Sequence, residues 1–188
     1  MTTAEDDAYT EYVTAKMQWV RGVAYLLCQD WHRADELGQI TITKLYVHWG
    51  RIAKVANLDG YVRAILVNTF LAEQRSPRWK RVVPHRSEPT AATTAESQQD
   101  VESVLDLRSA LKTLPPRQRA AVVMRYYSEL SVQETAEALG CSPGTVKSQT
   151  ARALASLRQV LEERQRESPV PNSPTSAFTV PVQTGGNR

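Results

Sequence analysis

A chain of 188 residues, 41% of them hydrophobic, can form one ordinary domain or two small ones and is too apolar to be disordered throughout. Glycine is scarce and alternating runs of Val, Ile and Thr are absent, so the composition predicts an all-α fold. The net charge of +3 weakly favours an anionic partner. The acidic first residues argue against a secretory signal, and no apolar run reaches the roughly 18–20 residues of a membrane span, so we expect a cytoplasmic protein without membrane insertion.

Three helices are predicted in the first part of the chain, and we assign them to a helical domain over residues 5–82. Apolar residues at helical spacing run from Tyr9 to Leu27. Asp30 is a candidate cap for a second helix, and a turn at Asn57–Gly60 precedes a third helix over residues 61–75.

The end of the third helix and the residues after it are basic, because Gln74 to Ser87 contains several Lys and Arg but no Asp or Glu. Basic residues among aromatic ones, here Tyr61, Phe70 and Trp79, are typical of surfaces that stack unpaired bases. A core position for Phe70 and a solvated helix end account for the same residues equally well. The composition alone leaves both interpretations open.

Composition changes after this segment. Residues 83–99 are rich in Pro, Ala, Thr and Ser and too polar to bury a core, which predicts a flexible linker between two helical domains. The second domain is expected over residues 100–166, with Pro115–Pro116 separating its first two helices. Residues 167–188 are rich in proline, and we expect a disordered tail.

The second domain contains a helix-turn-helix pattern. Ser131 and Glu134 form a capping box at the start of a short helix. Ala136 is small enough for a close helix crossing, Gly140 suits the turn, and Val146 anchors the next helix in the core. This spacing is that of helix-turn-helix DNA-binding motifs.

The last helix, from Pro143 to about residue 163, carries two stripes. Its inward stripe is predicted to contain Val146, Thr150, Ala153, Leu154 and Leu157. Its outward stripe is predicted to contain Thr145, Ser148, Gln149 and Arg152, with Lys147 at the edge. A solvated helix face can have a similar composition, but the agreement of caps, turn and stripes favours a helix that enters a major groove.

No catalytic or metal-binding pattern stands out. Cys28 and Cys141 have no metal-ligand spacing and are expected to be two small buried hydrophobic residues. His32, His48 and His85 are scattered, and no glycine-rich phosphate loop is present. We therefore expect a protein that is not an enzyme and that has no cofactor and no metal.

Four segments resemble a known family. They are ADELGQITITKLY, YVRAILVNTFLAEQR, LPPRQRAAVVMRYY and SVQETAEALGCSPGTVKSQTARALASLR. On these motifs the chain resembles the extracytoplasmic-function class of bacterial RNA polymerase sigma factors, which keep only sigma domains 2 and 4. The resemblance implies that the first helical domain is sigma domain 2 and the second is sigma domain 4.

The resemblance also implies partners and contacts. Asp35, Glu36 and Gln39 would dock on the β′ clamp of core RNA polymerase, and the helix Arg117–Tyr127 on the β flap. The minus-35 promoter element would be contacted by Thr145, Lys147, Ser148, Gln149 and Arg152, with Arg117 and Arg119 near phosphates. The minus-10 element would be opened and held by Arg63, Asn68, Arg75, Trp79 and Lys80. Many relatives are held by an anti-sigma factor, which is a further candidate partner.

Two functions are compatible with the motifs. A promoter-specificity subunit, which redirects RNA polymerase and catalyses nothing, uses both domains and the linker. A free-standing helix-turn-helix repressor or activator uses only the second domain and leaves the two motifs of the first without a role. The sequence therefore favours an alternative sigma factor.

Overall fold

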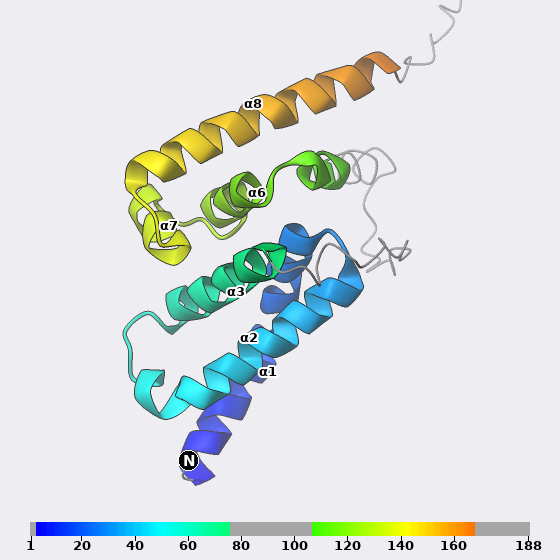
Figure 1. The fold of residues 1–188 in the computed structure, drawn as a ribbon. Helices are drawn as coiled ribbons and strands as arrows, with labels where there is room; N and C mark the ends of the chain where they lie inside the picture. The colour runs from blue at the N-terminus through cyan, green and yellow to red at the C-terminus, as the bar shows by residue number, and fades with distance from the viewer. Residues whose placement is uncertain (1–2, 76–106, 168–188) are drawn as a thin grey trace, which may run out of the picture.

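The computed structural model describes residues 3–75 and 107–167, and the secondary structure of this part of the chain is entirely helical (Figure 1). We call residues 3–75 the N-terminal group and residues 107–167 the C-terminal group. The all-α prediction is confirmed over these residues. The segment predicted to be a linker and the predicted tail beyond residue 167 lie outside the described residues.

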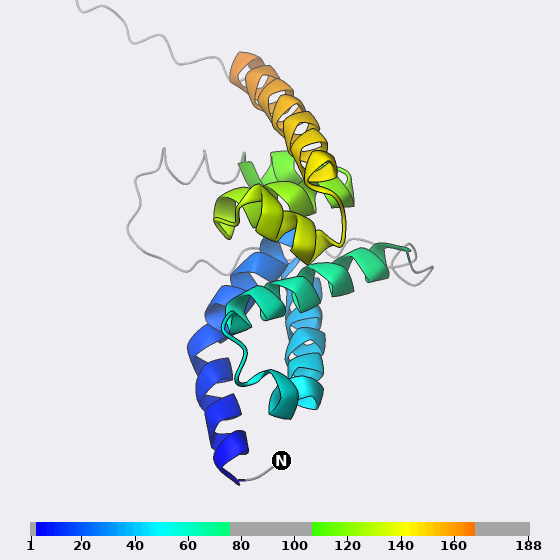
Figure 2. The ribbon, with the colours of Figure 1, turned by 90° about the vertical axis from the view of Figure 1, so that its left-hand side faces the viewer.

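The N-terminal group consists of α1 (Thr3–Cys28), α2 (Trp31–Ile52) and α3 (Leu58–Arg75). α1 and α2 run side by side, and α3 crosses them (Figures 1 and 2). Asp30 caps α2 as predicted, because its Oδ1 accepts a hydrogen bond of 3.0 Å from the backbone N–H of Arg33.

The third helix begins three residues earlier than the sequence pattern predicts. The side chain of Asn57 accepts a hydrogen bond of 2.7 Å from the backbone N–H of Gly60, which satisfies one of the unpaired donors of the first helical turn. α3 therefore starts at Leu58, and the predicted turn at Asn57–Gly60 is the beginning of the helix.

The C-terminal group begins with a helix over residues 107–113, followed by α6 (Pro116–Val122), which continues into the π-helical turn η1 (Val123–Tyr127). Then come α7 (Val132–Leu139) and α8 (Pro143–Glu167). Pro116 occupies the first turn of α6, where its missing N–H costs nothing. The C-terminal part of α8 extends away from the N-terminal group (Figures 1 and 2).

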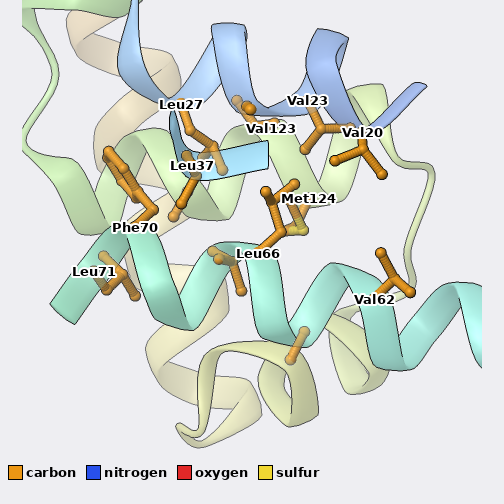
Figure 3. Close-up of a cluster of buried hydrophobic side chains, with 14 of the residues drawn as sticks. Val20, Val23, Leu27, Leu37, Val62, Leu66, Phe70, Leu71, Val123 and Met124 are labelled. Carbon is orange, nitrogen blue, oxygen red and sulfur yellow. The ribbon is translucent and has the colours of Figure 1, made fainter. Parts of the chain in front are cut away.

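The two groups share a hydrophobic core, although the composition of residues 83–99 predicts two loosely joined bundles. Val123 and Met124 point between α1 and α3, toward side chains that include Leu66 (Figure 3). Phe70 also belongs to this core and is 0% exposed, so it is a packing residue and not a surface for stacking bases. We call the contact across this core the seam. From the C-terminal group the seam contains Ala120, Val123, Met124, Leu130 and Ala138, which pack in one cluster with buried residues of α1, α2 and α3.

Candidate nucleic-acid interface

α7, the turn after it and α8 form the predicted helix-turn-helix. The Ser131 hydroxyl accepts a hydrogen bond of 3.1 Å from the backbone N–H of Glu134, and the Glu134 carboxylate accepts one of 2.8 Å from the backbone N–H of Ser131. The predicted capping box is therefore confirmed. These bonds from Ser131 also hold the pKa of the Glu134 carboxyl below its ordinary value.

The turn and the first residues of α8 are also as predicted. Gly140 has φ 59°, a left-handed conformation that favours glycine, and it lies in open space, so the backbone conformation alone explains this residue. The Ser142 hydroxyl accepts a hydrogen bond of 3.1 Å from the backbone N–H of Thr145 and caps α8. Ala136 and Val146 are buried, as their roles at the crossing and in the core require.

The inward stripe of α8 is confirmed except at one position. Val146, Ala153 and Leu157 are buried, and Thr150 is half-buried. Leu154 is 39% exposed, so its prediction as a core residue is wrong. The buried residues Val146, Ala153 and Leu157 are seven and eleven residues apart counted from Val146, so they lie on one side of α8. Leu154 is rotated by about 100° from Ala153 around the helix axis and lies outside that side.

The outward stripe of α8 is accessible. Lys147, Ser148 and Arg152 are exposed, and Thr145 and Gln149 are partly exposed. Lys147, Gln149 and Arg152 make no ion pair or side-chain hydrogen bond with another described residue. Their donors are therefore available to an external acceptor such as a base edge or a phosphate.

Of the two arginines predicted near phosphates, one is exposed and the other is turned inward. Arg117 is exposed on α6. The Arg119 guanidinium instead donates hydrogen bonds to the carbonyl oxygens of Leu27 at 2.8 Å, Leu114 at 3.0 Å and Lys112 at 3.2 Å. Burial lowers the pKa of Arg119, and burial also raises the pKa of the neighbouring Cys28 thiol to about 12. Arg119 therefore joins the two groups across the seam.

The residues of α3 predicted to contact the minus-10 element have different surroundings. Asn68 Nδ2 donates a hydrogen bond of 3.0 Å to the carbonyl oxygen of Ala138 in α7. The Arg63 guanidinium lies over the ring of Trp19, with Cζ 5.0 Å from the ring centroid. Arg75 is exposed at the end of α3. The predictions for Trp79 and Lys80 lie outside the described residues.

The residues predicted to dock on polymerase lie on the accessible side of α2. Asp35 is partly exposed and forms an ion pair with Arg21, with Nε–Oδ1 at 2.6 Å. Glu36 and Gln39 are exposed. Val47, about two turns beyond Gln39 on α2, is 71% exposed although it is apolar, and the sequence pattern does not predict it as part of this surface.

No group of His, Cys, Asp and Glu in residues 3–75 and 107–167 is arranged to hold a metal ion. None of their helices combines the length and apolar character that a membrane crossing requires.

α7 packs against α8, and the polar stripe of α8 remains accessible. This pair of helices forms a helix-turn-helix DNA-binding unit. The model of the family Sigma-70, region 4, matches residues 105–157. The chain is 36% identical over 156 residues to the RNA polymerase sigma-E factor of Streptomyces avermitilis, covering 83% of this chain and 86% of that protein. It is 28% identical over 158 residues to the ECF RNA polymerase sigma factor EcfG of Rhodopseudomonas palustris, covering 82% of this chain and 86% of that one.

A solved structure has the same fold. The sigma factor RpoE from Bartonella quintana, in complex with the anti-sigma factor NepR, superimposes with a TM-score of 0.67 at 24% identity, over 82% of this chain and 96% of that one. The chain belongs to the extracytoplasmic-function class of RNA polymerase sigma factors. The relatives match both helical groups, and nothing supports the alternative of a free-standing repressor or activator.

Proposed function

We propose that the chain binds core RNA polymerase and directs it to initiate transcription at specific promoters. It acts as a regulatory subunit in the cytoplasm, and the phosphoryl transfer of RNA synthesis belongs to the polymerase. We assign the roles of sigma domain 2 to residues 5–82 and of sigma domain 4 to residues 100–166. In this assignment residues 83–99 connect the two domains.

One observation carries the proposal for promoter recognition: the stripe of α8 with Lys147, Gln149 and Arg152 is accessible and has no internal partners among the described residues. A helix of this kind fits the major groove, where amide and guanidinium groups read base edges and Lys holds phosphates. We assign to this stripe the contacts with the minus-35 element, together with Thr145, Ser148 and the exposed Arg117.

The minus-10 element is assigned to α3 and the residues after it. Arg63, Asn68 and Arg75 lie along this helix, and Trp79 and Lys80 follow it in sequence. An aromatic residue among cations suits unpaired bases, because stacking contributes about 1–3 kcal/mol per base and offsets the cost of flipping.

Docking on polymerase is assigned to two surfaces. Asp35, Glu36 and Gln39 on α2 would contact the β′ clamp, and α6 with η1 would contact the β flap. The anti-sigma factor named in the Bartonella quintana complex supports a partner of that class for this chain as well.

The test is run-off transcription with core RNA polymerase, the full chain and a library of promoter fragments. We expect initiation at one defined motif that core polymerase alone does not use. DNA binding without initiation would overturn the proposal. Replacing Lys54 by Ala gives a control that should leave motif selection unchanged, because Lys54 is exposed, follows α2 and is assigned no contact with DNA or polymerase.

A further inference from the structure

The outward face of α8 has a centre made of small side chains. α6 and α7 pack on the inner side of α8, which lies at the outer edge of the molecule (Figures 1 and 2). At about 100° per residue, the positions opposite the buried Val146 and Ala153 are all exposed and all small. We call them the floor of α8: Gly144, Ser148, Ala151 and Ala155. No long side chain of the floor keeps the helix away from a surface, so α8 can approach base edges closely.

Two longer polar side chains lie together on one side of the floor. Gln149 and Arg152 are three residues apart, which places them about 60° apart around the helix axis and about 4.5 Å apart along it. Neighbouring base pairs of a DNA duplex are separated by about 3.4 Å along its axis. The two side chains therefore match the spacing of two neighbouring base pairs.

The amide of Gln149 has no partner within its own helix. Gln133 and Gln159, on other exposed helix turns, each donate to the glutamate four residues further along, at 3.2 Å and 3.1 Å. Four residues after Gln149 the chain has Ala153, which offers no side-chain acceptor. Both the donor and the acceptor of the Gln149 amide are therefore free for an external group.

The guanidinium of Arg152 is free for a similar reason. From Pro143 to Leu161, α8 contains no Asp or Glu, and its first acidic residue is Glu162. No carboxylate lies at the three- or four-residue spacing that would pair with Arg152. The side chain makes no ion pair with another described residue.

The other polar side chains of the outward face are less selective. The hydroxyls of Thr145 and Ser142 are hydrogen-bonded to each other at 2.9 Å. The Ser148 hydroxyl donates its only hydrogen to the Thr145 carbonyl at 3.0 Å, so its oxygen can only accept. Lys147 is a point charge that suits phosphates and does not distinguish bases. Among the described residues of the outward stripe, only Gln149 and Arg152 keep a free planar group.

We propose that Gln149 and Arg152 alone determine which bases α8 selects, and that they read an adenine and a guanine on neighbouring base pairs. This inference rests on the proposed function. The amide of Gln149 has the donor and the acceptor that match N7 and N6 of adenine in the major groove. The guanidinium of Arg152 has the paired donors that match O6 and N7 of guanine. The remaining polar residues of the stripe contribute affinity and not base selection.

The first experiment identifies the two base pairs. Holoenzyme made from core RNA polymerase and the full chain selects duplexes from a library with a randomised minus-35 element. We expect neighbouring A·T and G·C pairs in the selected element, and replacing either pair should weaken binding by about 5- to 150-fold. A selected element without such neighbouring pairs would overturn the inference.

The second experiment changes the preference at each pair separately. Gln149→Arg should change the preferred A·T pair to G·C, and Arg152→Gln should change the neighbouring G·C pair to A·T. Gln159→Arg, the same substitution at an exposed position further along α8, is the control and should change no base preference. The inference fails if either variant leaves the preference unchanged or changes it at a pair other than the expected one. Both positions tolerate substitution without loss of a described contact, so cooperative unfolding should persist.

The third experiment tests the residues that are not assigned base selection. Lys147→Ala and Ser148→Ala should weaken binding to all duplexes by the same factor. Lys147→Ala should also lower the slope of log affinity against log salt concentration by about 1. A changed base preference in either variant would contradict the assignment of base selection to Gln149 and Arg152 alone.

The floor is tested by adding volume to it. Ala151→Leu should weaken binding to all duplexes by about tenfold, because the larger side chain holds α8 away from the base edges. Ala15→Leu, at an exposed position of α1, is the control and should bind like the parent. Unchanged affinity in Ala151→Leu would show that the floor does not approach the base edges, and the inference would then fail.

The two proposals fail in different ways. If the chain directs no initiation with core polymerase, the proposed function fails, while binding of the duplex library still decides which bases Gln149 and Arg152 select. If initiation occurs at a defined motif and the two exchange variants leave its base preference unchanged, only the assignment of base selection fails.

Discussion

The seam and the outward stripe of α8 contain the same kinds of side chain in opposite situations. In the seam, the Asn68 amide and the Arg119 guanidinium donate to helix-end carbonyls of the other group. On α8, Gln149 and Arg152 have no partner among the described residues. An amide or guanidinium group therefore does not by itself mark a DNA contact. Such a group is available to DNA only where no unpaired carbonyl of the chain lies within hydrogen-bonding distance of it.

This difference has an energetic consequence. Replacing a seam residue removes contacts that exist in the free chain, so the change should appear in the free energy of unfolding. Replacing a residue of the α8 stripe removes contacts that form only with DNA, so the change should appear in promoter selection.

Met124→Ala should cause the largest loss of stability. Met124 is 0% exposed and lies between the two groups, so its truncation removes buried apolar area and leaves a cavity. We expect the free energy of unfolding to fall by about 2–5 kcal/mol, measured by urea denaturation followed by circular dichroism. Leu154→Ala, at a position that is 39% exposed, is the control and should lose much less. Equal losses would mean that the seam does not contribute to the stability of the free chain.

Arg119→Ala should have the next largest effect on stability. The variant removes hydrogen bonds from a charged group to the Leu27 and Leu114 carbonyls and leaves these acceptors without that partner. We expect a loss of about 2–3 kcal/mol in the free energy of unfolding. Arg117→Ala, at the exposed arginine two residues earlier on α6, should stay within about 0.5 kcal/mol of the parent. A loss as large for Arg117→Ala would place the effect in helix propensity and not in the seam.

Arg152→Ala should affect promoter selection and not stability. The free energy of unfolding should hardly change, because the side chain is exposed and unpartnered among the described residues. Promoter discrimination by the holoenzyme should fall by about 1–3 kcal/mol, measured by competition between the selected promoter and single-base variants of its minus-35 element. Arg158→Ala, at an exposed arginine further along α8, is the control. Unchanged motif preference in Arg152→Ala would remove this residue from the recognition surface.

The helix-turn-helix could be predicted from the sequence because its signals are local. The capping box of Ser131 and Glu134 spans four residues, and Gly140 meets a conformational demand of its own turn. The helical spacing of apolar residues in α8 correctly predicted that Val146 and Ala153 are buried. The same spacing wrongly predicted a buried Leu154, because the width of the buried face depends on the neighbouring helices.

The seam could not be predicted in the same way. Its two central hydrogen bonds join residues that are 70 and 92 positions apart. Both acceptors are backbone carbonyl groups, and every residue has one, so the residue type does not mark the acceptor. The polar composition of residues 83–99 predicts a connection between two units, but it contains no information on how these units pack. For this reason Asn68 and Arg119 were assigned to DNA by resemblance, without their internal partners.

Ser131→Ala tests a smaller contribution, in the element that connects the seam to α8. The variant removes the hydroxyl that accepts from Glu134 and leaves an unpaired backbone donor at the start of α7. We expect a loss of about 1 kcal/mol in the free energy of unfolding. Ser131→Asn, which retains a capping oxygen, should recover most of it. If both variants lose the same amount, the cap does not stabilise the helix-turn-helix.

The smallest predicted effect concerns a polar contact inside the N-terminal group, intermediate between the buried seam and the accessible stripe. Asp59 accepts hydrogen bonds from Lys16 at 2.7 Å and Tyr12 at 2.8 Å. Burial acts to raise the pKa of the Asp59 carboxyl, but these hydrogen bonds and the nearby positive charges of Lys16 and Arg63 hold it below its ordinary value of 3.8.

Because the pKa of Asp59 is lower in the folded than in the unfolded chain, its contribution is complete above pH 3.8 and is lost as the pH falls below that value, through the folded pKa. The side chain is 34% exposed, so we expect less than about 1 kcal/mol. Asp59→Asn should therefore lose less stability than the parent between about pH 6 and about pH 3, measured by urea denaturation. An identical pH dependence in both chains would show that solvent screens this ion pair as fully as it screens an exposed one, which would place Asp59 with the unpartnered charges of α8 and not with the seam.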